Sequence, residues 1–230
     1  MAEPDISGIF SRMTSSNAAA ARFERAAARL FGAAALACSS LGCSDESASK
    51  PAEPSPSVWV GEVEGSDARV ALAQRDGAVT LFFCGGDDSY MTDTRWFAED
   101  ALPNAAFSFT DGGWSVNGVL EKGVASGSVQ TETDAARDWT AARVDPRTIA
   151  GLYAGVAPCG KLGLIVTQAT ADDEPSGQGT CLRVEASGVI VEQVNPVRLV
   201  QLRSTHEISV TVASAPDQQF TVLPVASVEQ

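Results

Sequence analysis

The sequence of 230 residues predicts an all-β protein. From Val58 onward, short runs rich in β-branched and aromatic residues recur roughly every 8 to 12 residues, a spacing typical of β-sandwiches and barrels. Turn-forming clusters separate the runs, and Asp76-Gly77 and Asp111-Gly112 are typical of tight hairpin turns, because glycine adopts positive φ without steric cost. After Ser57 we find neither helical periodicity nor alternation of strands with helices, which argues against an α/β fold.

The first eight expected strands occupy residues 58–145. Alternation with period 2 supports them, since Val79, Leu81 and Phe83, for example, fall on one face of their strand. The intervening turns are mostly short, so we expect an antiparallel meander, and closure into a small eight-stranded barrel would remove its exposed edges. The expected strands are Val58–Val63, Ala68–Gln74, Ala78–Cys84, Thr94–Ala98, Ala105–Thr110, Trp114–Leu120, Val124–Gln130 and Asp138–Val144.

A second small β unit is expected in residues 149–226. A polar, glycine-bearing loop between Gln168 and Thr180 interrupts it. The sequence leaves open whether this unit forms its own domain or packs on the first. Its expected strands are Gly151–Val156, Leu162–Gln168, Cys181–Glu185, Val189–Val194, Val197–Leu202, Ile208–Ala213 and Phe220–Val225.

Residues 1–42 have the organisation of an export signal. Basic side chains such as Arg22 and Arg29 precede a mildly apolar run, Leu30–Leu41, which is too short for a transmembrane helix. Met13 is an alternative start that would give a signal of ordinary length. Two other interpretations stay open: cleavage by an ordinary signal peptidase, and an amphipathic Ala/Arg helix of a cytoplasmic fold.

The segment Ser40-Leu41-Gly42-Cys43 resembles the lipobox of bacterial lipoproteins. The resemblance implies cleavage before Cys43 and diacylation of its thiol, and Ala35-Leu36-Ala37-Cys38 is a competing site. It also implies a cell-envelope protein, lipid-anchored to a bacterial membrane and facing the extracytoplasmic side. Residues 43–57 are polar and proline-rich, so we expect an extended tether between this anchor and the folded part.

A second resemblance covers roughly Val58 to Gly155. It is carried by Val79–Cys84, Trp96-Phe97, Val116-Asn117-Gly118-Val119, Val124–Val129 and Gly151-Leu152-Tyr153. The succession is similar to uncharacterised β-rich domains of exported bacterial proteins. It implies an exported β domain and no particular activity.

The charge balance restricts the partners. The net charge of −13 disfavours nucleic acid and anionic membrane surfaces. With His206 as the single histidine, a His-rich zinc or iron site is excluded, and we expect neither a metal nor a cofactor. Two acidic loops, one with Asp87, Asp88 and Asp93 and one with residues 172–174, could offer oxygen ligands to calcium, although solvated loops are the simpler interpretation.

Three cysteines remain once Cys43 is acylated and Cys38 is removed with the signal. Cys159 and Cys181 bracket a predicted strand and loop, and an oxidising envelope favours a disulfide between them. Such a bond would contribute about 3 kcal/mol by chain-entropy arguments. Cys84 ends a very apolar strand and is expected to be a small buried hydrophobe. Pairing through Cys84 and a fully reduced state are the alternatives.

The four tryptophans fall on four different predicted strands. Inward-facing aromatic rings either fill a small barrel or line a ligand cavity in it. The sequence leaves both roles open for these residues, which are Trp59, Trp96, Trp114 and Trp139.

The sequence predicts a non-catalytic protein. It has no G-x-S-x-G element, no supported S-x-x-K motif and no phosphate-binding glycine loop, so we nominate no catalytic residue. We therefore expect a binding or interaction module for an envelope protein or a small ligand. The alternatives are a structural spacer without a specific ligand and an envelope hydrolase with an unrecognised site.

Overall fold

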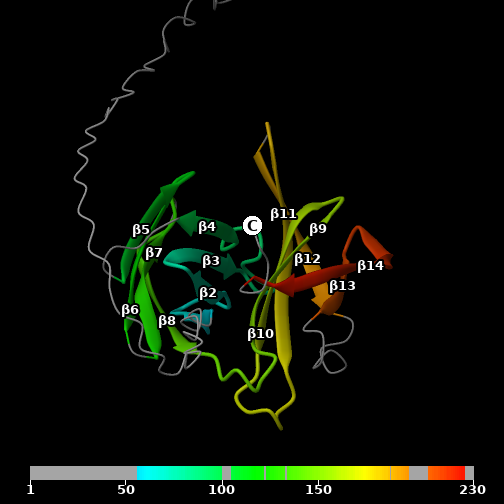
Figure 1. Cartoon of the computed structure of the whole chain (residues 1–230). Coiled ribbons are helices and arrows are strands. Elements are labelled where there is room, and N and C mark those ends of the chain that lie inside the picture. Colours follow the sequence, from blue (N-terminus) through cyan, green and yellow to red (C-terminus); the bar gives the residue numbers. More distant parts are fainter. Residues whose placement is uncertain are drawn as a thin grey trace, which may run out of the picture. The chain divides into compact units, whose positions relative to one another are not determined.

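The computed structural model describes residues 56–99, 105–121, 123–132, 134–186, 188–196 and 207–225. Its regular elements are all strands, which confirms the predicted all-β class (Figure 1). None of these residues belongs to a helix long and apolar enough to cross a membrane. The signal sequence, Cys43, most of the tether, the expected strand Val197–Leu202 and His206 lie outside the described residues.

The first eight strands form one antiparallel sheet in the order β4-β3-β2-β1-β8-β7-β6-β5. This is the predicted meander, and β1 pairs with both β2 and β8, so the first and last strands close it into a nearly complete barrel. The strands are β1 (Ser57–Val63), β2 (Arg69–Arg75), β3 (Ala78–Cys84), β4 (Arg95–Glu99), β5 (Ala106–Asp111), β6 (Trp114–Glu121), β7 (Val124–Gln130) and β8 (Arg137–Arg143).

The open seam of this barrel lies between β4 and β5, which share no hydrogen-bond ladder among the described residues. Side chains cross the seam instead. The Arg95 guanidinium donates hydrogen bonds to the Asp111 carboxylate, with 3.1 Å between Nε and Oδ2. The rings of Phe97 and Phe109 pack with centroids 5.3 Å apart. An ion pair and an aromatic contact therefore connect the two edge strands.

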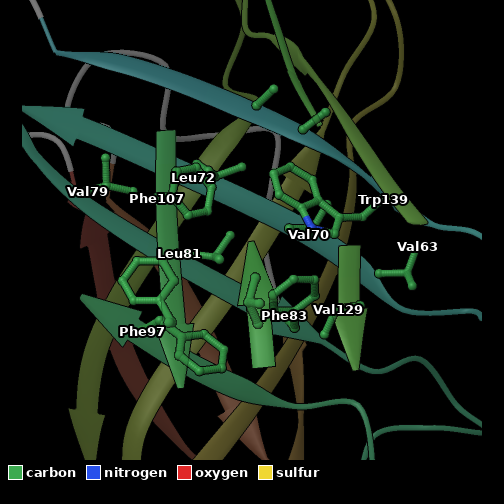
Figure 2. Packing of buried hydrophobic residues seen from close by; sticks show 14 of the residues in the cluster. Val63, Val70, Leu72, Val79, Leu81, Phe83, Phe97, Phe107, Val129 and Trp139 are labelled. Atoms are coloured by element: carbon green, nitrogen blue, oxygen red, sulfur yellow. The ribbon is translucent and has the colours of Figure 1, made fainter. Parts of the chain in front are cut away.

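Aromatic and aliphatic side chains fill the interior of the first barrel (Figure 2). Strand β6 alternates between buried and exposed residues, so one of its faces points inward. On that face a Cβ at Gly118 would lie 2.5 Å from the Phe107 ring and 2.6 Å from the Trp139 ring. Glycine is therefore required at position 118, because two aromatic rings occupy the space of a side chain.

The other six strands form a closed barrel in the order β10-β11-β12-β13-β14-β9. A disulfide between Cys159 and Cys181, with the Cα atoms 6.0 Å apart, ties the β9–β10 turn to β11 and confirms the predicted pair. The strands are β9 (Gly151–Ala157), β10 (Gly160–Thr167), β11 (Ser176–Glu185), β12 (Gly188–Pro196), β13 (Ile208–Val212) and β14 (Ala215–Pro224).

Strand β11 begins five residues before its predicted start at Cys181. The sequence of this extension, Ser176–Thr180, is polar and glycine-rich, so its local propensity indicates a loop. In the structure it pairs with β10 through the register Leu164↔Gly179 and Thr167↔Ser176. The prediction was wrong here because pairing with an apolar neighbouring strand overrides weak local propensity.

The two barrels pack against each other and belong to one compact unit. Phe82 and Trp96 stack on the outer face of β3 and β4, with ring centroids 4.2 Å apart. A Cβ at Gly163 of β10 would lie 2.5 Å from the Phe82 ring, so this glycine permits the close approach. The shared cluster resolves what the sequence left open, and its buried members are Ala71, Ala73, Phe82, Cys84, Leu152 and Ile165.

Introducing a methyl group at this contact should destabilise the protein. We expect Gly163→Ala to lower the free energy of unfolding by about 1–3 kcal/mol, because the packed rings of Phe82 and Trp96 leave no room for a Cβ. Urea unfolding would measure this in the natural chain and in a Phe82→Leu background. The loss should be smaller where leucine replaces the ring, and equal losses in both backgrounds would contradict this account of the interface.

Candidate functional site

A polar cleft of about 430 Å³ lies where the two barrels meet. Asp67 comes from the turn after β1, and the loop after β3 contributes Gly85 to Asp88. Strands β11 and β12 form the opposite wall through Gly177, Gln178, Gly179, Gln193 and Val194. Residues more than a hundred positions apart in the sequence thus share one cleft.

Two glutamines of the second barrel hold the loop of the first. Gln178 Nε2 donates hydrogen bonds to the backbone carbonyl oxygens of Cys84, at 2.5 Å, and of Asp67, at 3.2 Å. Gln193 Nε2 donates to Asp87 Oδ1 at 3.1 Å. These bonds join side chains of β11 and β12 to the β1–β2 turn, to the end of β3 and to the loop after it, so the walls of the cleft are held at a defined separation.

The Asp67 carboxylate holds the loop after β3 in place by hydrogen bonds. Its Oδ2 accepts a hydrogen bond from the backbone N–H of Asp88 at 2.8 Å, and its Oδ1 accepts one from the Ser89 hydroxyl. The Ser89 hydrogen bond, supported by backbone N–H groups, lowers the pKa of Asp67 below its ordinary value. Asp67 is therefore a hydrogen-bond acceptor at neutral pH and carries a negative charge into the cleft.

The cleft offers acceptors and amide groups to a ligand. The described residues of its lining include no Ser, Cys, His, Lys or Arg. The carboxylate of Asp88 accepts no hydrogen bond from the described residues, so it remains available at the cleft, whereas Asp67 and Asp87 are already engaged. Chemically, this arrangement can bind a molecule that donates hydrogen bonds, but it lacks a nucleophile with an adjacent base.

A buried ion pair supports the same loop from its other side. The Arg137 guanidinium binds Asp93 in a bidentate manner, at 2.6 Å (Nη1–Oδ2) and 2.9 Å (Nη2–Oδ1), and the Ser66 hydroxyl donates to Asp93 Oδ2 at 2.7 Å. Burial alone would raise the pKa of Asp93. The bonds from Arg137 and Ser66 outweigh it and hold the pKa below its usual value. A neighbouring recess of about 600 Å³ is lined by this pair and also by Asp67 and Asp88.

The acidic loops do not form a metal centre among the described residues, which contain no group of three or more His, Cys, Asp or Glu side chains placed to hold an ion. Asp87, Asp93 and Asp67 instead have separate protein partners. In the second acidic loop, Asp173 Oδ2 accepts hydrogen bonds from the backbone N–H and the hydroxyl of Thr170, both at 2.8 Å. These carboxylates therefore stabilise loops.

A third pocket, of about 660 Å³, lies beside the segment that connects β8 to β9. Leu152, Tyr153 and Pro224 contribute to its lining. Tyr153 is buried, which raises the pKa of its phenol to about 12, and its hydroxyl donates a hydrogen bond to the Ile149 carbonyl at 2.7 Å. The hydroxyl therefore stays protonated and has a structural partner, so it is poorly suited to proton transfer.

The four tryptophans separate into two environments. Trp59, Trp114 and Trp139 are buried in the core of the first barrel. Trp96 lies on the outer face of β4, stacked on Phe82 and facing the second barrel. None of the four lines the three pockets described above. The structure thus places these rings in packing roles, three inside the barrel and one between the barrels.

The free cysteine among the described residues is Cys84, and it is buried at the junction of the barrels. Its Sγ lies 3.9 Å from Thr180 Oγ1 on β11. Burial raises the pKa of the thiol to about 12, so the reactive thiolate is scarce at neutral pH. The prediction of a small buried hydrophobe is confirmed, and the alternative pairing through Cys84 is wrong.

Sequence reasoning missed the residues that build the cleft. Asp87 and Asp88 were identified only as part of an acidic loop, whereas Asp67, Gln178 and Gln193 carried no recognisable signal. An isolated glutamine in a strand belongs to no recognisable motif. Its role in the cleft depends on which hydrogen-bond acceptor the tertiary structure places next to it.

Comparison of the chain with protein-family models, with curated proteins and with solved structures found no match.

The Asp93–Arg137 pair should make stability depend on acid pH. We expect Asp93→Asn to cost about 1–3 kcal/mol at pH 7, because it leaves a partly buried guanidinium without its counter-charge. Folding lowers the pKa of Asp93 from 3.8. The stabilisation of the folded state by the Asp93 carboxylate is therefore present above about pH 4 and is lost as the pH falls below that value. The difference in the free energy of unfolding between the variant and the natural chain, measured with urea, should therefore decrease from pH 7 to pH 3. The exposed Asp172→Asn is the matched control, and a difference independent of pH would contradict the assignment.

Proposed function

We propose that this protein is an exported, lipid-anchored protein of the bacterial cell envelope whose two-barrel unit is a non-catalytic binding module. The observation that carries the proposal is the polar cleft between the barrels. Its walls come from two barrels and are held by the Gln178 and Gln193 hydrogen bonds, while the Asp88 carboxylate has no partner among the described residues.

The chemistry of the lining supports binding over hydrolysis. A general acid needs a pKa near the working pH, and the pKa of Asp67 is shifted away from that range. The other polar groups of the lining are carboxylates, amides and glycine backbone. A ligand with several hydroxyl or ammonium donors, such as an oligosaccharide or a polyamine, matches these acceptors.

Two features support export and anchoring. The segment Ser40-Leu41-Gly42-Cys43 follows a basic and then an apolar stretch, as in lipoprotein signals. The Cys159–Cys181 disulfide suits an oxidising compartment, where such bonds persist. With Cys43 acylated, the proline-rich segment that follows would tether the barrels to a bacterial membrane on its extracytoplasmic side.

The lipid anchor is testable by metabolic labelling with a radioactive or clickable fatty acid in a bacterial host. We expect the natural chain to incorporate the label and Cys43→Ala to lose it, because acylation requires the thiol of the first mature residue. The matched control is Cys38→Ala, which removes the competing cysteine and should keep the label. Unchanged incorporation in Cys43→Ala would contradict anchoring at this residue.

The binding role is testable by a thermal-shift screen of the full chain against neutral oligosaccharides, polyamines and basic peptides. We expect at least one class to raise Tm through binding to the folded state, and Asp88→Asn to weaken that binding by tenfold or more. Asp88→Asn leaves the backbone hydrogen bond to Asp67 intact, and Asp172→Asn is the control for loss of one charge. If no class raises Tm at millimolar concentration, the spacer alternative is favoured over a ligand-binding cleft.

A further inference from the structure

The outer face of the second barrel is only partly covered by the first. Strand register arranges its outward residues in rows across β9, β10, β11 and β12. The first row includes Leu152 and Ile165, and the next includes Gly163 and Thr180. In these rows Leu152, Ile165 and Thr180 are at most 1% exposed, and the rings of Phe82 and Trp96 cover Gly163.

The same face continues beyond the first barrel and remains apolar. The following row is Val156–Lys161–Leu182–Val191, and Val184 pairs with Val189 closer to the hairpin tip. Val156 is 80%, Val184 70% and Val189 43% exposed. Figure 1 shows this β11–β12 hairpin extending past the ends of β9 and β10. We call these six residues the hairpin face. It is the uncovered continuation of an established interface, and contiguous exposed apolar surface of this kind marks interaction sites.

The backbone beside the hairpin face also has an unpaired edge. Strand β12 pairs with β11 along most of its length, but it pairs with β13 only from Val194 onward. The part from Gly188 to Glu192 therefore has no second strand partner among the described residues. An exposed strand edge with apolar side chains is a template for addition of another strand.

One cation lies within the hairpin face. Lys161 Nζ rests 4.0 Å from the centroid of the Trp96 ring, and no described carboxylate forms an ion pair with it. The nearby Arg183, in contrast, pairs with Glu185 at 3.0 Å. Lys161 of β10 is therefore held over the Trp96 ring, two strands away from the edge of β12.

We infer that the hairpin face binds an extended segment of another protein, which adds as a strand to the free edge of β12. The segment carries apolar side chains at alternate positions, which pack on Val184, Val189 and their neighbours. This surface is separate from the function proposed for the cleft and does not depend on it.

Two other occupants fit less well. A second copy of this chain brings another large negative charge, which opposes close approach. A membrane surface would satisfy the exposed valines, but hydrocarbon leaves the unpaired backbone groups of β12 without partners. A peptide strand satisfies both the apolar side chains and the backbone edge of β12.

The experiment uses the full chain with Cys43→Ser, immobilised and panned against a random twelve-residue peptide library. Selected peptides should alternate apolar and polar residues, and their affinity is measured by fluorescence anisotropy. We expect the double variant Val184→Lys/Val189→Lys to weaken binding by tenfold or more. Val124→Lys, at a similarly exposed valine on β7 of the first barrel, is the matched control and should bind normally.

Two further comparisons test the mode of binding. N-methylation of the peptide at alternate residues removes the donors of one edge and should abolish binding, whereas simple apolar adsorption would survive it. Lys161→Ala should leave the affinity unchanged, because Lys161 lies on β10, two strands from the edge of β12. Retained binding by both N-methylated registers, or by Val184→Lys/Val189→Lys, would overturn the inference. Dimers detected by sedimentation, or flotation of the protein with zwitterionic vesicles, would also overturn the inference if the double variant abolished them. Either result would assign the face to a different occupant.

Discussion

The rest of the structure depends on the contact in which Phe82 and Trp96 stack over Gly163. This contact buries the outer face of β3 on β10, so strands of both barrels are covered on two sides. In β2, four consecutive residues from Val70 to Ala73 are buried for this reason, whereas β6 alternates between buried and exposed residues. Burial of a second face removes more apolar surface from water than either barrel could achieve alone.

The cleft is a consequence of that contact. Once β10 lies on β3, the neighbouring β11 and β12 reach the loop after β3, and Gln178 and Gln193 bind it. The Asp93–Arg137 pair stabilises the loop from the opposite side. A loop supported on both sides keeps its carboxylates in place, which lowers the entropic cost of binding a polar ligand. The proposed binding role therefore follows from how the barrels pack rather than from a local motif.

The outer face of β9 to β12 carries apolar side chains both where it is covered and where it is exposed. Leu152 and Ile165 are buried under the first barrel, while Val156 and Val184 continue the same surface into solvent. Exposed apolar surface that continues an existing interface is typical of an interaction site. Together with the edge of β12 that has no second strand partner among the described residues, it supports the proposed contact with another polypeptide.

The sequence by itself determined the features that depend on near neighbours. Asp76 and Gly77 both adopt positive φ, so the β2–β3 turn follows from residue chemistry, and alternation of apolar residues identifies β6. The sequence favoured the Cys159–Cys181 pair, and the structure decided it against pairing through Cys84. Only the tertiary structure decided the start of β11, the packing of the second barrel on the first and the separate role of Trp96. It also decided that Gln178 and Gln193 build a cleft. These features depend on which distant strand covers an outward face, and a local pattern carries no information about the residue that will lie opposite it.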